Sequence, residues 1–280
     1  MRIYISVDLE GVNGVLHSSQ TQPGEPGYQR AVELMHEETN AIIEGLVEGG
    51  ATEILVNDSH WDMRNLMIER LHPLASLVSG WQKPFSMVSQ LDGAKQLADA
   101  ACFVGYHTKA GTARGVLSHT YRAQVFFDIK INGQSVGETG LNAALAGWFG
   151  VPIALVTGDD ALGEEVETIL PGVTFAQTKR AVSRYAACCP PHKVLLAELK
   201  SQARQAIEQR RRWVLYQPQR PTELEITFFD PAMADAAELI PGISRKNDRI
   251  VSATEADYSV LFRLMLAAGA LGASRKDPYF

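Results

Sequence analysis

A pair of acids near the start of the chain is the first feature that could do chemistry. Asp8 and Glu10 follow the apolar run 2–7 and are separated by one residue. In an extended chain, residues i and i+2 point to the same side. Two neighbouring carboxylates repel each other, and burial strengthens the repulsion. A divalent cation between them would relieve it, whereas for this fragment alone an exposed acid pair is an equal alternative.

Three more residues of metal-binding type follow other apolar segments. His60 and His107 each come directly after one, and Glu138 stands at the start of a predicted helix. A single histidine in such a place is more often a structural residue, and a single acid is ordinary at a helix start. Together with the acid pair, however, they form a mixed Asp, Glu and His set. Such a set is sufficient for two divalent ions with one bridging carboxylate and open positions for water, as in two-metal hydrolases.

A further candidate is His119, in the run 115–120, which could be either a ligand or a base. The remaining histidines, at positions 17, 36, 72 and 192, lack a comparable context. The chain contains no Gly-x-Gly-x-x-Gly after a strand, no Walker loop, no Gly-x-Ser-x-Gly elbow and no His-Glu-x-x-His helix. These absences leave the acid and histidine set as the main chemical signal.

The elements that must position these residues alternate between strands and helices. Strands are predicted at 2–8, 53–56, 100–105 and 153–157, and helices at 28–47 and 141–149. This alternation indicates a mixed or mostly parallel central sheet flanked by helices. Ligands bind beyond the carboxyl ends of the strands in such sheets. The polar residues gather at those ends, which carry Asp8, His60, His107 and Asp159.

The second half of the chain is less patterned. A hairpin is predicted at 125–136 around Asn132-Gly133, a polar helix at 194–213, a strand at 224–229 and an apolar helix at 258–271. We therefore expect an α/β metal-binding catalytic domain over residues 1–162. A smaller α+β domain over residues 163–280 is expected to contribute to oligomerisation and to the pocket.

Composition excludes several classes of protein. The 280 residues carry a net charge of −6, which argues against nucleic acid as a main partner. No apolar run is long enough to span a bilayer, and the opening run is too short for a secretory signal. The three cysteines, Cys102, Cys188 and Cys189, indicate no disulfide framework. We therefore expect a cytoplasmic protein with reduced thiols.

Six short motifs, in the same order and at similar spacing, resemble the DppA-type D-aminopeptidases, a family of dinuclear zinc peptidases. The resemblance extends over nearly the whole chain and is densest in the first 160 residues. The six motifs are Ser6-Val7-Asp8-Leu9-Glu10-Gly11, Val56-Asn57-Asp58-Ser59-His60, Lys83-Pro84-Phe85-Ser86-Met87, Gly105-Tyr106-His107, Ser118-His119, and the segment from Gly137 to Ala143.

The resemblance implies roles that spacing alone does not give. It implies that two zinc ions are bound by Asp8, Glu10, His60, His107 and Glu138, with the aspartate bridging, and that His119 is the catalytic residue. It also implies hydrolysis of short peptides that carry a free N-terminal D-amino acid, D-alanine first, by a metal-activated water. The implied assembly is a homodecamer of two stacked five-membered rings.

Two alternatives stay open. Another dinuclear hydrolase, an amidase or a phosphoesterase, could present the same ligands, and a phosphoesterase would need basic groups such as Lys109 and Arg114 nearby. A non-catalytic ring protein that binds peptide or metal is the other alternative. The presence of all five ligands and of His119 argues against it.

Overall fold

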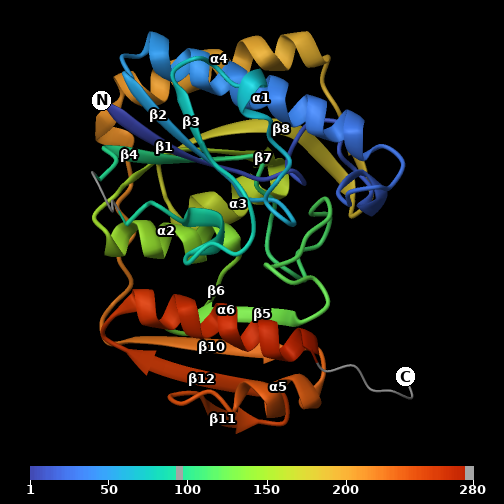
Figure 1. The fold of residues 1–280 in the computed structure, drawn as a ribbon, viewed down its shortest axis with the longest axis vertical. Helices are drawn as coiled ribbons and strands as arrows, with labels where there is room; N and C mark the ends of the chain where they lie inside the picture. The colour runs from blue at the N-terminus through green and yellow to red at the C-terminus, as the bar shows by residue number, and fades with distance from the viewer. Residues whose placement is uncertain (93–96, 275–280) are drawn as a thin grey trace.

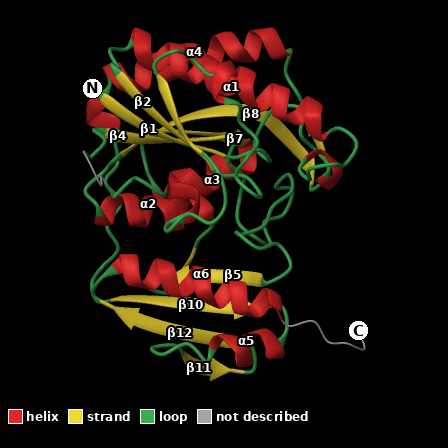
Figure 2. Cartoon of the chain, in the orientation of Figure 1, coloured by secondary structure: helices red, strands yellow, loops and turns green. Residues whose placement is uncertain are grey.

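Two β-sheets with their helices make up the protein (Figures 1 and 2). A computed structural model describes residues 1–92 and 97–274. The larger sheet has the order β3-β2-β1-β4-β7-β8-β9, and the smaller has the order β11-β12-β10-β5-β6. The strands of the larger sheet are β1 (Arg2–Val7), β2 (Glu53–Asp58), β3 (Ala75–Val78), β4 (Ala100–Val104), β7 (Ile153–Asp159), β8 (Thr174–Ser183) and β9 (Ala186–Cys188).

The strands of the smaller sheet are β5 (Phe126–Ile131), β6 (Gln134–Ser135), β10 (Thr222–Phe228), β11 (Ser244–Asn247) and β12 (Ile250–Glu255). The α-helices are α1 (Tyr28–Glu48), α2 (Glu138–Trp148), α3 (Asp160–Ile169), α4 (His192–Glu208), α5 (Pro231–Ala237) and α6 (Tyr258–Ser274). Short 3₁₀ turns lie at Ser18–Gln20, Ile68–Arg70, Ser86–Val88 and Arg210–Arg212.

The larger sheet is parallel except for β9, which pairs antiparallel to β8. Its central strands are apolar on both faces because helices cover both. In β1, Ile3 and Ile5 pack into the hydrophobic cluster beneath α1 and α4, whereas Tyr4 packs into the cluster on the opposite face. Helices α2 and α3 lie on that opposite face, as Figure 1 shows. The expected α/β class, a mostly parallel sheet flanked by helices, is therefore confirmed.

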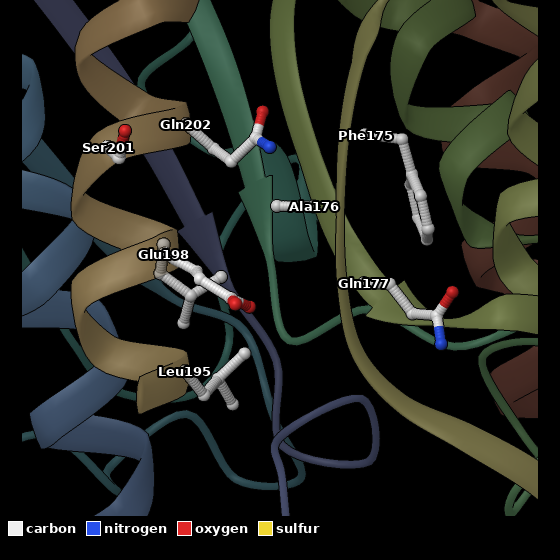
Figure 3. A pocket seen from close by; sticks show the side chains of 8 residues that line it. Phe175, Ala176, Gln177, Leu195, Glu198, Ser201 and Gln202 are labelled. Carbon is white, nitrogen blue, oxygen red and sulfur yellow. The ribbon is translucent and has the colours of Figure 1, made fainter. Parts of the chain in front are cut away.

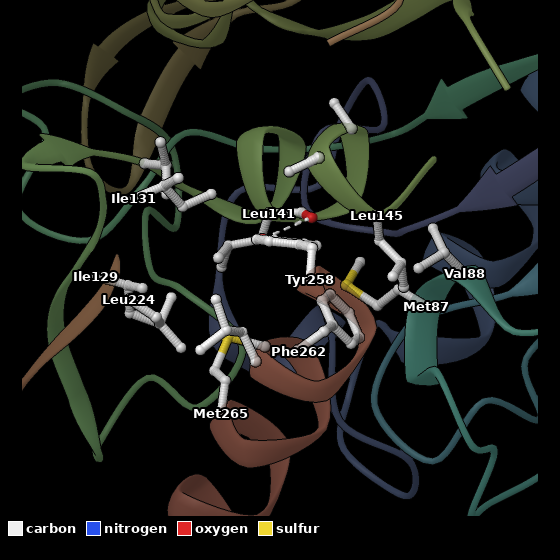
Figure 4. Close-up of a cluster of buried hydrophobic side chains, with 14 of the residues drawn as sticks. Met87, Val88, Ile129, Ile131, Leu141, Leu145, Leu224, Tyr258, Phe262 and Met265 are labelled. Carbon is white, nitrogen blue, oxygen red and sulfur yellow. Dashed lines mark hydrogen bonds between the residues drawn. The ribbon is translucent and has the colours of Figure 1, made fainter. Parts of the chain in front are cut away.

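The smaller sheet is antiparallel, and its hairpin forms where the sequence predicted it. Asn132 and Gly133 both have positive φ, 49° and 82°, which a two-residue turn of this kind requires. Helix α6 packs on this sheet and also reaches α2, where the Tyr258 hydroxyl donates to the carbonyl of Leu141 at 3.2 Å (Figure 4). Phe262 and Met87 belong to the same buried cluster, so one core connects α6 to the larger sheet.

The two sheets do not divide the chain at residue 162. Strands β5 and β6 precede that position and pair into the smaller sheet, whereas β8 and β9 follow it and complete the larger one. Residues 126–135 therefore join the smaller sheet through the pairing of β5 with β10. A domain boundary near residue 162 stays a prediction, but the strand pairing does not change there.

Several elements had no prediction from the sequence, namely β3, α3, β8, β9, α5, β11 and β12. The predicted helix at 258–271 is α6, whose apolar residues face the core and the neighbouring cavity. Within residues 1–92 and 97–274, no helix combines the length and the apolar character needed to cross a membrane.

Helices α1 and α4 approach closely at Gly45, and this contact gives a first prediction. A Cβ at Gly45 would lie 2.1 Å from the Lys200 carbonyl oxygen and 2.9 Å from Ala203 Cβ. Overpacking of this kind costs about 1–3 kcal/mol, against a helix-propensity gain of about 1 kcal/mol for Gly→Ala. We expect Gly45→Ala to lower the free energy of unfolding, measured by denaturant titration at fixed protein concentration.

The control for this prediction is Lys193→Ala on the exposed side of α4, which should change stability by less than about 0.5 kcal/mol. A Gly45→Ala variant more stable than the parent would show that the two helices separate without cost.

Candidate metal centre

The pairing of β1 with β2 and β4 brings three chain segments to one edge of the larger sheet. Val7 is level with Asp58 on one side and with Val104 on the other. The amide of Asp8 donates to the Val104 carbonyl at 2.8 Å, and that of Ser59 donates to the Val7 carbonyl at 2.8 Å. The loops that carry His60 and His107 therefore start on either side of Asp8.

Two glycines let these loops approach each other. The amide of Gly11 donates to the Gly105 carbonyl at 2.8 Å, and a Cβ at Gly11 would lie 1.9 Å from the Tyr106 carbonyl oxygen. Gly105 has φ +69°, and a Cβ there would lie 2.3 Å from the Asp8 carbonyl oxygen. No larger residue fits at either position without moving the backbone that carries Asp8.

The first cluster of the site consists of Asp8, Glu10 and His60. The His60 Nδ1 atom lies 3.1 Å from Asp8 Oδ1 and 3.0 Å from Glu10 Oε2. All three side chains are buried. Their ligand atoms lie within 4.8 Å of one another, a separation compatible with one shared metal ion.

The second cluster consists of His107, His119 and Glu138, at the start of α2. The Glu138 Oε1 atom lies 3.5 Å from His107 Nε2 and 3.8 Å from His119 Nε2. The two imidazoles stack with their ring centroids 4.1 Å apart. Asp8 connects the clusters, because its Oδ2 lies 3.4 Å from His107 Nε2. The structure thus brings together all six residues selected from the sequence.

Each histidine of the site has one ring nitrogen bound to a backbone carbonyl. His60 Nε2 lies 2.7 Å from the Thr21 oxygen, His107 Nδ1 lies 3.0 Å from the Thr108 oxygen, and His119 Nδ1 lies 2.9 Å from the Leu117 oxygen. A carbonyl oxygen only accepts, so these nitrogens carry the hydrogen. The other nitrogen of each ring faces the carboxylates, which is how backbone contacts orient metal-binding histidines.

Unpaired buried atoms give a physical test of whether a metal fits. Within the described residues, Asp8 Oδ2, Glu10 Oε2 and His107 Nε2 are buried without a hydrogen-bond partner. Such atoms are costly in a protein interior. Burial and the neighbouring Glu10 raise the pKa of Asp8 to about 7. Burial lowers the pKa of His107, but the carboxylates of Glu138 and Asp8 have the larger combined effect and raise it to about 10. The cluster therefore favours positive charge, and its oxygen and imidazole donors suit zinc.

Lys179 on β8 holds the loop that carries Glu10. It is buried, and its ammonium group donates to the carbonyls of Glu10, Val12 and Val15 at 2.6, 2.8 and 2.7 Å. Burial lowers its pKa to about 8. All three of its donors are used on one loop, so it fixes the backbone of Glu10. Sequence reasoning missed this residue because β8 was not predicted.

Acids outside the metal clusters hold the other loops of the site. Glu165 on α3 accepts from the Thr108 hydroxyl and the Lys109 amide at 2.8 Å, and from the Gly137 amide at 3.1 Å. It thereby ties the loop after His107 to the start of α2. Sequence reasoning did not identify Glu165 either.

Asp159 has a similar structural role. It accepts from the Leu162 amide at 2.9 Å, which caps α3, and from the Val116 amide at 2.8 Å, which holds the loop before His119. Asp159, at the end of β7, therefore has a structural role. The sequence had grouped it with Asp8, His60 and His107 at the ends of the strands.

A large cavity opens onto the clusters. Its volume is about 1210 Å³, and its wall includes Asp8, Glu10, His60, Glu138 and His119. Residues of α6 form another part of the wall: Arg263, Leu266, Ala267, Ala270 and Ala273. Neither Lys109 nor Arg114 lines it. Five other basic residues do: Arg64, Lys83, Arg122, Arg184 and Arg263.

A smaller hollow of about 420 Å³ lies between β8 and α4 (Figure 3). Gln177, Glu198, Ser201 and Gln202 supply its polar side chains. It has one carboxylate and no histidine in its lining, so it lacks the donor set found in the larger cavity.

Comparisons with known proteins agree with this geometry. A family model described as D-aminopeptidase, of the M55 peptidases, matches residues 1–267. A D-aminopeptidase of Bacillus subtilis (strain 168) is 42% identical over 252 residues, which cover 88% of each chain. The solved structure of the Zn-dependent D-aminopeptidase DppA from Bacillus subtilis, described as a self-compartmentalizing protease, superposes with a TM-score of 0.94 at 36% identity. The match covers 99% of this chain and 100% of that one. The chain therefore belongs to the D-aminopeptidase family of peptidases.

Proposed function

We propose that this zinc peptidase uses two zinc ions to release N-terminal D-amino acids, D-alanine first, from short peptides with a free amino terminus. The observation that carries this proposal is the pair of buried clusters joined by Asp8 at the wall of one large cavity. Two clusters that share one carboxylate provide the ligands of a two-metal hydrolase. Family membership supplies the peptide chemistry and the D configuration.

The ligand assignment follows from the contacts. Asp8, Glu10 and His60 would hold one ion, and His107 and Glu138 would hold the second, with Asp8 shared. When bound, zinc supplies Lewis acidity that makes water a nucleophile at neutral pH and polarises a carbonyl group. The Tyr121 amide donates to Glu138 at 2.6 Å and so fixes the orientation of that carboxylate.

His119 is assigned the catalytic role because it is the more accessible histidine of its cluster. Its side chain is 18% exposed and lines the cavity, whereas that of His107 is 2% exposed and does not line it. Its Nδ1 is bound to the Leu117 carbonyl, so its Nε2 is the atom that can accept a proton from the attacking water and return it to the leaving amine. Burial and the neighbouring His107 lower its pKa, which favours the neutral ring that such a base requires.

The metal site suits a substrate with a free amino group. With two zinc ions bound, the carboxylates of Asp8, Glu10 and Glu138 would be compensated, and a neutral amine could occupy an open coordination position. Acylating the amine would remove that donor. The site would therefore act on the first residue of a peptide rather than within the chain.

The phosphoesterase alternative loses the basic residues on which it was based. Lys109 and Arg114 lie outside the cavity wall, and the matched relatives are peptidases. The non-catalytic alternative requires a damaged site. The two clusters that contain the five proposed ligands and His119 instead support an intact site.

We also propose that the chain forms a cytoplasmic homodecamer with its cavities facing an inner chamber. The matched DppA structure is described as self-compartmentalizing, and the two folds agree over nearly their full lengths. A chamber of this kind would exclude folded proteins by size, in agreement with a preference for short peptides.

The first prediction of this proposal concerns metal content. Protein prepared without chelator should contain two zinc ions per chain by elemental analysis, because the donors exceed the needs of one ion. His119→Ala should keep both ions and lose roughly 10²–10⁴-fold in kcat, the usual contribution of a positioned acid or base. Glu10→Ala is the matched ligand variant and should lose zinc.

Either of two results would contradict this assignment. Fully active protein with one zinc per chain would exclude the dinuclear site. Loss of zinc from His119→Ala would make His119 a ligand, a role that its distance from Glu138 permits.

The second prediction concerns chirality and the amino terminus. The kcat/KM for D-Ala-D-Ala should exceed that for L-Ala-D-Ala by on the order of 100-fold, the discrimination that one misplaced methyl group gives. N-acetyl-D-Ala-D-Ala should be cleaved poorly, because acetylation removes the amine donor. An equal rate with the L peptide would keep the metal hydrolase and refute the D specificity.

The third prediction concerns assembly. Light scattering at micromolar concentration should give ten times the mass of one chain. A value of one or two chains under conditions of full activity would refute the decamer.

A further inference from the structure

One cationic side chain in the cavity has no anion opposite it. Arg122 is half-buried in the wall, three residues after His119. Its guanidinium makes no hydrogen bond or ion pair with any residue in the described ranges 1–92 and 97–274; its one aromatic contact is the ring of Trp81, 5.9 Å from the guanidinium carbon. A Cβ added at Gly269 of α6 would meet Arg122 Cδ at 3.3 Å, so the side chain is held against that helix.

The other cations of the cavity wall are engaged. Arg64 pairs with Asp62 at 2.5 Å, and Lys83 donates to the Asn57 side chain at 2.7 Å. Arg184 donates to the Ser118 hydroxyl at 2.7 Å and also to the Ser118 carbonyl.

Arg263 differs from Arg122 in exposure and bonding. It is exposed on α6, and its Nε donates to the Ser259 carbonyl at 3.2 Å. Arg122 is thus the cation in this wall whose five donors remain available to a ligand.

We propose that Arg122 binds the C-terminal carboxylate of a short peptide whose amino end lies at the metal clusters, an inference that rests on the proposed function. A half-buried guanidinium without an anion loses hydration, and the contact with the Trp81 ring satisfies none of its five donors. Burial accordingly lowers the pKa of Arg122. A carboxylate suits this group because its two oxygens match the planar fork of donors.

The position of Arg122 beside the metal clusters favours a short peptide. Tyr121, next to Arg122, donates its amide to Glu138 at 2.6 Å, so the backbone at this point touches the metal cluster. The arginine side chain then extends from there towards Trp81 and α6. A dipeptide spans about 7 Å and a tripeptide about 10 Å when extended. A short peptide whose amino end lies at the metal clusters would therefore direct its carboxylate towards Arg122.

The test compares D-Ala-D-Ala with its C-terminal amide, D-Ala-D-Ala-NH₂, on the zinc-loaded protein. In the parent, the acid should have a kcat/KM about 10- to 100-fold higher than the amide, mainly through KM, as expected for a hydrogen-bonded charged group. In Arg122→Met the ratio should fall to near one. Arg122→Lys keeps the charge without the fork and should restore part of the ratio.

Arg263→Met is the matched control, since it removes one positive charge from the same cavity wall. In this variant, the ratio of kcat/KM for the acid to kcat/KM for the amide should stay near that of the parent. A thermal unfolding curve for each variant shows whether it is folded. Because Arg122→Lys keeps the volume and charge, it stays informative if Arg122→Met unfolds.

Calorimetric titration of the same two peptides separates this inference from the proposed function. Tighter binding of the acid by the parent, lost in Arg122→Met, supports the carboxylate site even if no peptide is cleaved. Cleavage of both peptides with a ratio near one in the parent leaves the peptidase intact and overturns the role of Arg122. Equal losses for acid and amide in Arg122→Met would show a structural role and also overturn it.

Discussion

Repulsion among buried carboxylates is the constraint on which the rest of this structure depends. Asp8, Glu10 and Glu138 lie at one edge of the larger sheet, almost without solvent. Three negative charges in a weakly polar interior are unstable unless cations lie between them. Among the described residues, Asp8 Oδ2 and Glu10 Oε2 lack hydrogen bonds. The site is thus organised for bound cations, and the fold must hold the three carboxylates together against their mutual repulsion.

The residues around the clusters stabilise this arrangement by binding the backbone of the loops that carry the ligands. They do not neutralise the ligand side chains. Lys179 binds three carbonyls of the loop after Glu10, and Glu165 binds two amides and one hydroxyl around His107 and Gly137. Neither group pairs with a carboxylate of the clusters. If Lys179 paired with Glu10 directly, it would compete with a metal for the same oxygen. Binding the backbone leaves the ligand atoms free, as a rigid metal site requires.

The sequence was sufficient to select the residues of the two clusters and insufficient to find the residues that hold them, and the reason is physical. Asp8, His60 and His107 follow parallel strands directly, so the alternation of strands and helices places them at one edge of the sheet. Lys179 and Glu165 act from β8 and α3, whose pairing and packing depend on contacts distant in sequence. The same limit applies to the second sheet. Strands β5 and β10 are far apart in the chain, and no local pattern shows that residues 126–131 pair with residues 222–228 rather than with the nearer β7.

Different parts of the fold line the two sides of the cavity. One side carries the metal clusters, and the other shapes the space for the rest of the peptide. The metal clusters depend on the larger sheet and on α2, where Gly11 and Gly105 tolerate no side chain and the loops touch one another. The opposite wall comes from α6 and from residues 121–126, and the Tyr121 amide in this segment donates to Glu138 of the clusters. Substitutions in that wall change the shape and charge of the cavity without moving Asp8 or His60. Arg122 lies at this boundary, next to Tyr121 in the chain and packed against α6. Selectivity among short peptides can therefore change within this fold while the metal ligands stay fixed.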